Sequence, residues 1–277
     1  MWSGLRFRSV LDAFRLCQGT MNIVLGQLVR RMFHGLGLDV VRYRGGTHEP
    51  LPQDLDAGSM ETIRFVRART MTSPERLFAL IQAVRYVASS GVPGDIVECG
   101  VWRGGSMMAA ARTLIECGDQ TRTLYLFDTF DGMSAPTEKD VAIGGESADR
   151  LLANEKKSDP LSAWCLAPME DVVSGMTTTQ YLPERIRYVK GKVEDTIPEH
   201  APEKIAILRL DTDWYESTRH ELDHLYSRLS PGGVLIIDDY GHWAGCRQAV
   251  DEYFGKQKNA PLLVRVDYTG RIAVKPV

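Results

Sequence analysis

Two apolar runs of this chain end in aspartates: Leu208-Arg209-Leu210-Asp211-Thr212-Asp213-Trp214-Tyr215-Glu216 and Leu235-Ile236-Ile237-Asp238-Asp239-Tyr240. Short apolar runs of this kind are typical of buried strands, and ligands of open α/β sheets bind where the strands end. Carboxylates that converge at one place repel one another unless a cation lies between them, so the two runs predict a site for a hard divalent metal. The alternative is a set of solvated aspartates in strand-to-helix loops, where Asp serves as a helix cap.

The segments around these runs alternate between strand and helix patterns. Strands are expected at 96–100, 123–128, 186–189, 205–210 and 234–237. Helices are expected from residue 73 onward and at 104–117, 217–229 and 245–254. Ser73 followed by Pro74 is typical of a helix start, and Thr269-Gly270 is typical of the turn of a hairpin built from 262–268 and 271–274. Alternating strands and helices predict an α/β fold with a mostly parallel sheet, to which the hairpin adds an antiparallel strand.

The beginning of the chain does not follow this alternation. Residues 1–44 mix arginines with regularly spaced apolar residues, which predicts amphipathic helices. Such helices either bind a membrane surface or a partner, or pack as ordinary helices on the main domain or in a dimer. Residues 45–59 have the composition of a linker. We therefore expect an N-terminal helical extension and linker at 1–59 and the main domain at 60–277.

Residues 131–182 are too long for a simple crossover between two strands. An insertion near strand ends is typical of a lid that binds the acceptor of a reaction, and a helix is expected within it at 164–176. The alternative is a disordered surface loop. Apolar residues such as Trp164 and Val172 favour the lid, because a lid needs side chains that it can bury.

The composition of the chain bears on its partners and on the state of its cysteines. The chain has 277 residues, a net charge of −3 and five cysteines. The charge gives no argument for nucleic acid as a partner. The cysteines lack CxxC and zinc spacings, so we expect reduced thiols and a cytoplasmic location. We also expect no transmembrane segment and no signal peptide, because apolar runs are short and basic residues interrupt the start of the chain.

A glycine-rich turn follows the first expected strand: Glu98-Cys99-Gly100-Val101-Trp102-Arg103-Gly104-Gly105-Ser106. Glycine lets the backbone approach a ligand closely, and the start of the next helix offers free N–H groups. Asp128 ends the following strand, where an acid accepts hydrogen bonds from both ribose hydroxyls of a nucleotide. The two features together predict an adenosine-type ligand, although the GxGxxG spacing is absent.

Five blocks of the chain together resemble the macrocin O-methyltransferase family of class I S-adenosylmethionine-dependent methyltransferases: 94–106, 126–133, 189–198, 208–218 and 237–240. The resemblance covers about residues 60–277. It implies a Rossmann-like fold, with a mostly parallel seven-stranded sheet, and Mg²⁺-dependent methylation of a sugar hydroxyl, as on macrolide and aminocoumarin antibiotics. Residues 1–58 and 134–165 carry no motif of the family, so the resemblance names no particular sugar.

The resemblance also implies a role for each matching position. The implied cofactor residues are Thr70 and Met71 (a segment that closes over the cofactor), Glu98, Gly100 and Ser106 (methionine moiety), Asp128 (ribose), and Glu194 and Asp195 (adenine). The implied magnesium ligands are Asp211, Asp238 and Asp239, and the implied general base is Asp213. Coordination to Mg²⁺ stabilises a developing alkoxide, and a carboxylate beside the metal takes the proton. The alternative for Asp213 is a supporting contact or a cap of the helix near Ser217.

Two other functions stay open at this point. A catechol-type O-methyltransferase would keep the metal and the cofactor, but its lysine just past the first metal aspartate is absent from 214–216. A non-catalytic nucleoside-binding module would not need the four aspartates. His242 and Trp243 follow Asp239, and two placements are open. Either both line the acceptor pocket, or His242 lies in a surface loop and Trp243 packs in the core. As partners we expect a small glycosylated acceptor and further copies of the chain in a homo-oligomer.

Overall fold

A seven-stranded sheet runs through the part of the chain that a computed structural model describes, residues 51–159 and 162–277. The strand order is β3-β2-β1-β4-β5-β7-β6. The strands are β1 (Asp95–Cys99), β2 (Leu124–Asp128), β3 (Ile186–Lys190), β4 (Ile205–Leu210), β5 (Leu229–Ile237), β6 (Val264–Arg265) and β7 (Arg271–Val274). Strands β1 to β5 are parallel, whereas β7 runs antiparallel to β5 and β6 antiparallel to β7. This arrangement confirms the predicted α/β fold with an antiparallel C-terminal hairpin.

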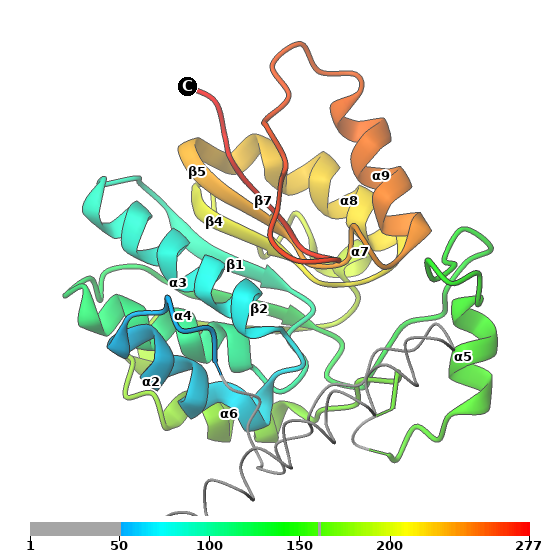
Figure 1. Ribbon diagram of the computed structural model, residues 1–277, viewed down its shortest axis with the longest axis horizontal. Helices are drawn as coiled ribbons and strands as arrows, with labels where there is room; N and C mark the ends of the chain where they lie inside the picture. The colour runs from blue at the N-terminus through cyan, green and yellow to red at the C-terminus, as the bar shows by residue number, and fades with distance from the viewer. Residues whose placement is uncertain (1–50, 160–161) are drawn as a thin grey trace, which may run out of the picture. The chain divides into compact units, whose positions relative to one another are not determined.

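Helices cover both faces of the sheet (Figure 1). One face carries α2 (Ala57–Val66), α3 (Pro74–Ser89), α4 (Gly105–Glu116) and α6 (Met169–Thr177). The other carries α7 (Val193–Thr196), α8 (Tyr215–Leu225) and α9 (Ala244–Phe254), and α5 (Ala148–Asn154) lies in the insertion. Short 3-10 turns are η1 (Arg67–Arg69), η2 (Pro183–Arg185) and η3 (Tyr226–Arg228). Each face of the sheet has its own cluster of buried apolar side chains, so the sheet is the middle of three layers.

Local sequence accounts for the start of the first two described helices. The hydroxyl of Ser73 accepts a hydrogen bond from the backbone N–H of Arg76 at 3.2 Å, and Pro74 occupies the first position of α3, as predicted. Asp56 caps α2 in the same way, through the backbone N–H of Ser59 at 3.0 Å. Helix α2 therefore begins inside the segment that has the composition of a linker. The division of the chain after residue 59 stays a prediction, since the expected amphipathic helices of 1–44 lie outside the described residues.

Several expected boundaries on the C-terminal side were wrong. The helix after β4 begins at Tyr215 and ends at Leu225, where a 3-10 turn replaces its expected last residues. Strand β5 begins at Leu229 instead of 234, because Gly232 and Gly233 continue the pairing through backbone hydrogen bonds with Lys275 at 3.0 and 2.8 Å. Strand β6 has two residues, fewer than expected for its side of the hairpin.

The insertion also differs from its prediction. Its helix was expected at 164–176, but α6 begins only after Pro168, and Cys165 has a left-handed backbone with φ of 48° that no helix accommodates. Helix α5 was not expected, although Ser147 caps it by accepting a hydrogen bond from the backbone N–H of Arg150. The insertion therefore contains two described helices rather than one.

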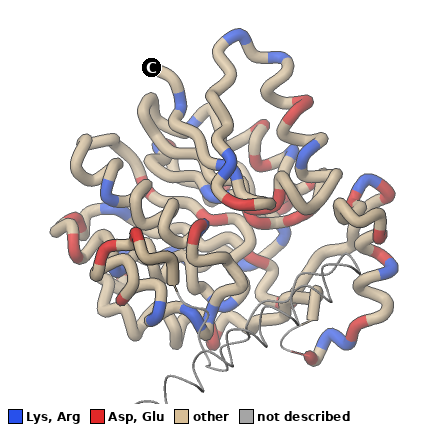
Figure 2. Tube along the Cα trace, viewed as in Figure 1, with Lys and Arg blue, Asp and Glu red and all other residues tan. Residues whose placement is uncertain are grey.

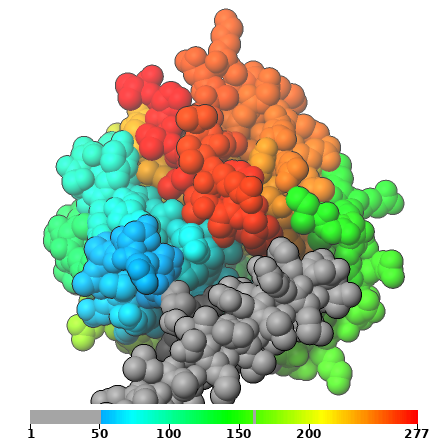
Figure 3. All heavy atoms as spheres, in the orientation of Figure 1, coloured from blue at the N-terminus to red at the C-terminus, as the bar shows by residue number. Residues whose placement is uncertain are grey.

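The strand order determines where a ligand can bind. From β1 the chain proceeds to β2 and β3 on one side, and it then returns to β4 and β5 on the other. Loops after β1 and β4 diverge at such a switch point and leave a crevice at the carboxyl ends of the strands. The C-terminal hairpin lies next to α3 (red beside cyan in Figure 3), and an ion pair of 3.0 Å joins Arg76 to Asp267 there.

The described surface carries mixed charge. Basic and acidic residues are interspersed along the chain in the view of Figure 2. Within residues 51–159 and 162–277, none of the helices has both the length and the apolar character of a membrane span.

Candidate active site

A cavity of about 390 Å³ opens at the carboxyl ends of β1, β2, β4 and β5. Most of the expected site residues line it: Thr70, Met71, Gly100, Ser106, Asp128, Glu194, Asp211, Asp213, Asp238 and Asp239. Two do not: Glu98 is buried within β1, and Asp195 is exposed on α7 outside this cavity. The fold therefore brings the implied cofactor and metal positions together, although they come from distant parts of the sequence.

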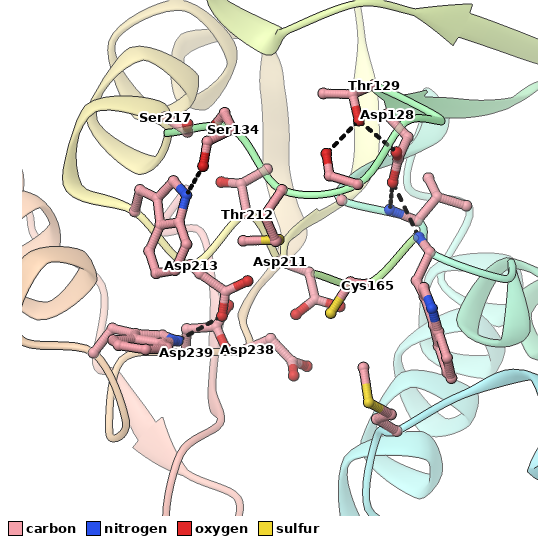
Figure 4. A pocket seen from close by; sticks show the side chains of 18 of the residues that line it. Asp128, Thr129, Ser134, Cys165, Asp211, Thr212, Asp213, Ser217, Asp238 and Asp239 are labelled. Carbon is pink, nitrogen blue, oxygen red and sulfur yellow. Dashed lines mark hydrogen bonds between the residues drawn. The ribbon is translucent and has the colours of Figure 1, made fainter. Parts of the chain in front are cut away.

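The implied metal ligands form a cluster. Single carboxylate oxygens of Asp211, Asp238 and Asp239 lie within 4.8 Å of one another. Figure 4 shows these carboxylates and that of Asp213 on one side of the pocket, with Asp128 on the opposite side. The cluster forms because β4 and β5 are neighbouring parallel strands that end at the same level.

A buried arginine, for which no role was predicted, connects these acids. Nη1 of Arg209 donates to Oε1 of Glu98 and Oδ2 of Asp211, each at 2.5 Å. Its Nη2 donates to Oδ1 of Asp238 at 2.5 Å and to Oγ1 of Thr72 at 3.1 Å. Burial alone would lower the pKa of Arg209, yet Asp211 and Glu98 raise that pKa above its ordinary value, so the guanidinium stays charged. A lone charge inside the apolar run 205–210 was the available signal.

A second arginine reaches the cluster from α3. Arg76 forms an ion pair with Oδ2 of Asp238, and its Nε lies 3.0 Å from Oδ2 of Asp267 in the hairpin turn. Because Arg209 already occupies Oδ1, both carboxylate oxygens of Asp238 accept from arginines. The carboxylate oxygens of Asp211 and Asp239 accept fewer hydrogen bonds from arginines than those of Asp238 do.

The remaining acids of the cluster crowd one another. Burial, followed by the charges of Asp213 and Asp211, raises the pKa of Asp239 well above its ordinary value. Burial and then the charge of Asp211 raise the pKa of Asp213 to about 7. Burial raises the pKa of Glu98 to about 8, and its Oε2 has no hydrogen-bond partner among the described residues. Buried carboxylate oxygens that repel one another are suitable ligands for a hard divalent cation, so these residues fit Mg²⁺.

Asp213 differs from the three implied ligands. Its backbone is left-handed, with φ of 66°, and its Oδ1 accepts a hydrogen bond from Nε1 of Trp243 at 2.6 Å. The alternative that Asp213 caps the following helix is wrong. The N-cap residue is Trp214, and the first N–H of the helix, that of Tyr215, donates to Oδ1 of Asp140 of the insertion at 2.8 Å. The carboxylate of Asp213 is therefore not used by the helix, and it lines the cavity.

Glycine is required at two positions of the turn after β1. Gly100 has φ of 81°, and a Cβ there would lie 1.9 Å from the carbonyl oxygen of Asp211. At Gly105 a Cβ would lie 2.5 Å from the carbonyl oxygen of Arg69 and 2.6 Å from Cβ of Thr70. The loop after β4 and the expected closing segment thus both contact the glycine turn directly.

Asp128 holds the same turn. Its Oδ2 accepts from the backbone N–H groups of Val101 at 2.7 Å and Trp102 at 3.0 Å, and its Oδ1 accepts from that of Phe130 at 2.7 Å. Trp102 has φ of 46°, which is unfavourable for a residue with a Cβ, so Asp128 supports a strained turn. A carboxylate accepts about four hydrogen bonds, and the fourth contact here is a long one of 3.5 Å from the hydroxyl of Thr129, which a ribose hydroxyl would replace. The ribose role stays a prediction.

The closing segment is tied to the insertion. Thr70 and Met71 follow η1, and the side chain of Met71 is 51% exposed. Nη1 of Arg69 lies 3.2 Å from Oδ1 of Asp171 in α6, and Nε of Arg103 in the glycine turn lies 2.8 Å from Oδ2 of the same residue. One acid of the insertion therefore holds both segments that are expected to contact the cofactor.

Other lining residues come from the far side of the cavity. Oε1 of Glu194 accepts from the hydroxyl of Ser217 at 2.8 Å and so joins α7 to α8. His242, Trp243 and Cys165 line the cavity, and Trp243 also packs in the buried apolar cluster of its face, so for Trp243 both predicted placements hold. Contact of these residues with an acceptor stays a prediction.

Comparison with known proteins shows the family of the chain. Residues 55–274 match the family described as Macrocin-O-methyltransferase (TylF). The chain belongs to this family. It is an S-adenosylmethionine-dependent O-methyltransferase, which confirms the resemblance drawn from the five sequence blocks. A nucleoside-binding module without activity is thereby excluded.

Three relatives of the chain have names that describe their reactions. The 8-demethyl-8-(2,3-dimethoxy-alpha-L-rhamnosyl)-tetracenomycin-C 4'-O-methyltransferase of Streptomyces olivaceus is 37% identical over 73% of this chain and 74% of its own length. The demethyldecarbamoylnovobiocin O-methyltransferase of Streptomyces niveus is 36% identical, with coverages of 73% and 74%. The mycinamicin III 3''-O-methyltransferase of Micromonospora griseorubida is 36% identical, with coverages of 73% and 77%.

Solved structures place the fold among methyltransferases. The O-methyltransferase NovP has a TM-score of 0.65 and 33% identity, covering 76% of this chain and 83% of that one. The calicheamicin methyltransferase CalS11 has a TM-score of 0.57 and 17% identity, covering 84% and 99%, and it supports the fold alone. Both agree with the class I architecture expected for the macrocin O-methyltransferase family.

Proposed function

We propose that this chain transfers the methyl group of S-adenosylmethionine to a sugar hydroxyl of a glycosylated small molecule, in a reaction that requires Mg²⁺. The names of the three relatives support such an acceptor, since they refer to a rhamnosyl tetracenomycin, a novobiocin precursor and mycinamicin III. The observation that carries the metal requirement is the carboxylate cluster beside Asp213, in the same cavity as the glycine turn.

In this proposal Asp211, Asp238 and Asp239 hold the metal and Asp213 is the general base. A bound Mg²⁺ would lower the free energy of the developing alkoxide at the acceptor oxygen. Asp213 takes the hydroxyl proton at a carboxylate oxygen. Arg209 holds the carboxylates of Asp211 and Asp238 in fixed orientations, which favours alignment of the acceptor with the methyl group.

The cofactor is proposed to lie along the glycine turn. Gly100 and Ser106 would contact the methionine moiety, Asp128 the ribose, and Glu194 the adenine. Thr70 and Met71 would cover the bound cofactor from the segment after η1. Glu98 would contact the methionine moiety from within β1, where its Oε2 has no hydrogen-bond partner in the described structure. Asp195 has the weakest support of the set, because it is exposed outside the main cavity.

The proposal extends to partners and location on sequence grounds alone. We infer a homo-oligomer and a cytoplasmic enzyme, and light scattering of the purified chain tests the first of these. A catechol-type acceptor has less support, because the loop after β4 carries Asp213 and no lysine.

The test is a methyl-transfer assay with labelled S-adenosylmethionine. The acceptor panel contains demethyldecarbamoylnovobiocin, mycinamicin III, the matching aglycones and a simple catechol. We expect transfer to a glycosylated compound, loss of transfer in EDTA, and its return when Mg²⁺ is added. Transfer to the catechol or the aglycones alone would contradict a sugar acceptor, and full activity after rigorous metal removal would contradict the metal.

A further inference from the structure

Trp243 lies on the loop between β5 and α9 and is 6% exposed. Its Nε1 donates to Oδ1 of Asp213 at 2.6 Å, a bond drawn as a dashed line in Figure 4. We propose that Trp243 is a positioning residue for methyl transfer, and that its indole N–H holds the carboxylate of Asp213 toward the acceptor oxygen. This inference rests on the role of Asp213 as general base in the proposed function.

The backbone of Asp213 supports this inference. A φ of 66° is unfavourable for aspartate, so contacts from the surrounding structure must maintain it. The helix that follows does not supply such a contact, because its N-cap residue is Trp214 and its first backbone N–H, that of Tyr215, donates to Asp140. In the described structure the Asp213 carboxylate accepts from Nε1 of Trp243. This indole N–H does not titrate, so the donor is present at every working pH.

The indole ring is itself held in place on two sides. It packs edge-on against the ring of Trp214, with centroids 4.9 Å apart and planes at 76°. Nε1 of Trp214 donates to the carbonyl oxygen of Ser134 in the insertion at 3.0 Å. The backbone of Trp243 also pairs with Ala142 of the insertion in an antiparallel bridge. Trp243 therefore places Asp213 relative to the insertion, the part of the chain expected to bind the acceptor.

The first test measures the chemical step in Trp243→Phe, which keeps an aromatic ring and removes the N–H donor. We expect the single-turnover rate on the best acceptor of the panel to fall roughly tenfold to a hundredfold, since small misplacements of a catalytic group have effects of that size. The affinities for S-adenosylmethionine and for Mg²⁺ should stay within about twofold of the wild-type values, because the phenylalanine removes no cofactor or metal contact. A normal rate in Trp243→Phe would overturn the proposal.

A matched variant controls for the general loss of an indole bond. Nε1 of Trp164 donates to the carbonyl oxygen of Leu152 at 3.0 Å, and Trp164 does not line the cavity. Trp164→Phe makes the same chemical change away from Asp213. Equal losses of rate in the two variants would overturn a specific role of Trp243. A normal single-turnover rate in Asp213→Asn would instead show that the base assignment, and thus the proposed function at this residue, is wrong.

The second test needs no acceptor. The chain has five tryptophans, so its ¹H–¹⁵N spectrum contains a small set of indole N–H signals, and Trp243→Phe identifies one by its loss. That signal should move in Asp213→Asn, because an amide replaces the carboxyl group that accepts the bond, and it should stay in place in Trp164→Phe. The remaining indole signals report whether each variant is folded. An unchanged chemical shift of the Trp243 signal in Asp213→Asn would overturn the proposal.

Discussion

Asp140 of the insertion accepts a hydrogen bond from the backbone N–H of Tyr215 at 2.8 Å, across 75 positions of sequence. The same carboxylate accepts from the backbone and the hydroxyl of Thr137 at 2.7 and 2.9 Å. Backbone bonds from Ile143 to His242 at 2.8 Å and from Ala244 to Val141 at 2.9 Å continue the attachment. This part of the insertion is therefore built into the wall of the active site, beside the loop that carries Asp213.

We predict that Asp140→Ala lowers both stability and activity. The variant leaves three donors without their acceptor, and loss of a helix N-cap alone costs about 0.5–2 kcal/mol. The melting temperature should fall by at least about 2–4 °C per kcal/mol lost. Asp149→Ala, which removes an exposed acid of the same insertion, is the control and should melt like the wild type. Equal melting curves for both variants would contradict the capping role.

Asp239→Asn should abolish turnover while cofactor affinity stays near the wild-type value. Asp239 is a better probe of the metal than Asp238, because both oxygens of Asp238 also bind arginines. Calorimetric titration of Mg²⁺ with S-adenosylhomocysteine present should show metal binding to the wild type and none to Asp239→Asn. Asp223→Asn, at an exposed acid paired with Arg219, controls for loss of a charge. Metal binding that survives in Asp239→Asn would remove this residue from the ligand set.

Asp128→Ala should weaken the binding of S-adenosylmethionine by roughly tenfold to a hundredfold. A charge-assisted hydrogen bond contributes about 1.5–3 kcal/mol, at 1.4 kcal/mol per decade of affinity. The structure adds a second reason, since the variant also releases the backbone of Val101 and Trp102. Equilibrium binding to the folded variant measures the effect. An unchanged dissociation constant would mean that the ribose is held elsewhere and that the turn keeps its shape without Asp128.

Asp213→Asn should lower the single-turnover rate by about 10²- to 10⁴-fold, because the amide cannot take a proton. Binding of Mg²⁺ and of S-adenosylmethionine should change little, since Asp211, Asp238 and Asp239 remain. Saturating Mg²⁺ and a single turnover separate the chemical step from product release. If metal affinity falls in parallel with the rate, Asp213 is a ligand or supports one.

Arg209→Met should be among the most destabilising single substitutions in the chain. It leaves Glu98, Asp211 and Asp238 without their shared partner, and loss of one member of a buried ion pair costs about 3–5 kcal/mol. Arg219→Met breaks an exposed pair and should cost about 0.3–0.5 kcal/mol in urea unfolding. Adding Asp211→Asn to Arg209→Met should recover part of the stability, because it removes a carboxylate that the arginine balances. No recovery, or a cost as small as that of Arg219→Met, would mean that the arginine does not balance these acids.

Much of the fold could be predicted because its signals are local. The apolar runs 205–210 and 234–237, the cap at Ser73 and the turn at Thr269-Gly270 each depend on a few adjacent residues, and each predicted an element that the structure contains. The four aspartates could be assigned to one site for a topological reason. Parallel strands of one sheet end at the same edge, so residues just after the strands meet.

Boundaries and partners were harder to predict. Helix α2 begins within a segment of linker composition. The cap at Asp56 and the burial of α2 in the apolar cluster that it shares with α3, α4 and α6 outweigh that composition. Arg209 was visible as a charge in an apolar strand, but nothing near it in sequence indicated that it binds Glu98 and Asp238 together.

Sequence alone established the α/β class, the strand ends and the acids at them, since periodicity, caps and turns act over a few residues. The tertiary structure decided which donor each acid receives. Asp140 caps a helix 75 positions away, and Trp243 reaches Asp213 across 30. Such pairs form only when packing brings distant segments within hydrogen-bond distance. The local sequence around Asp213 contains several polar residues and does not indicate which residue donates to its carboxylate.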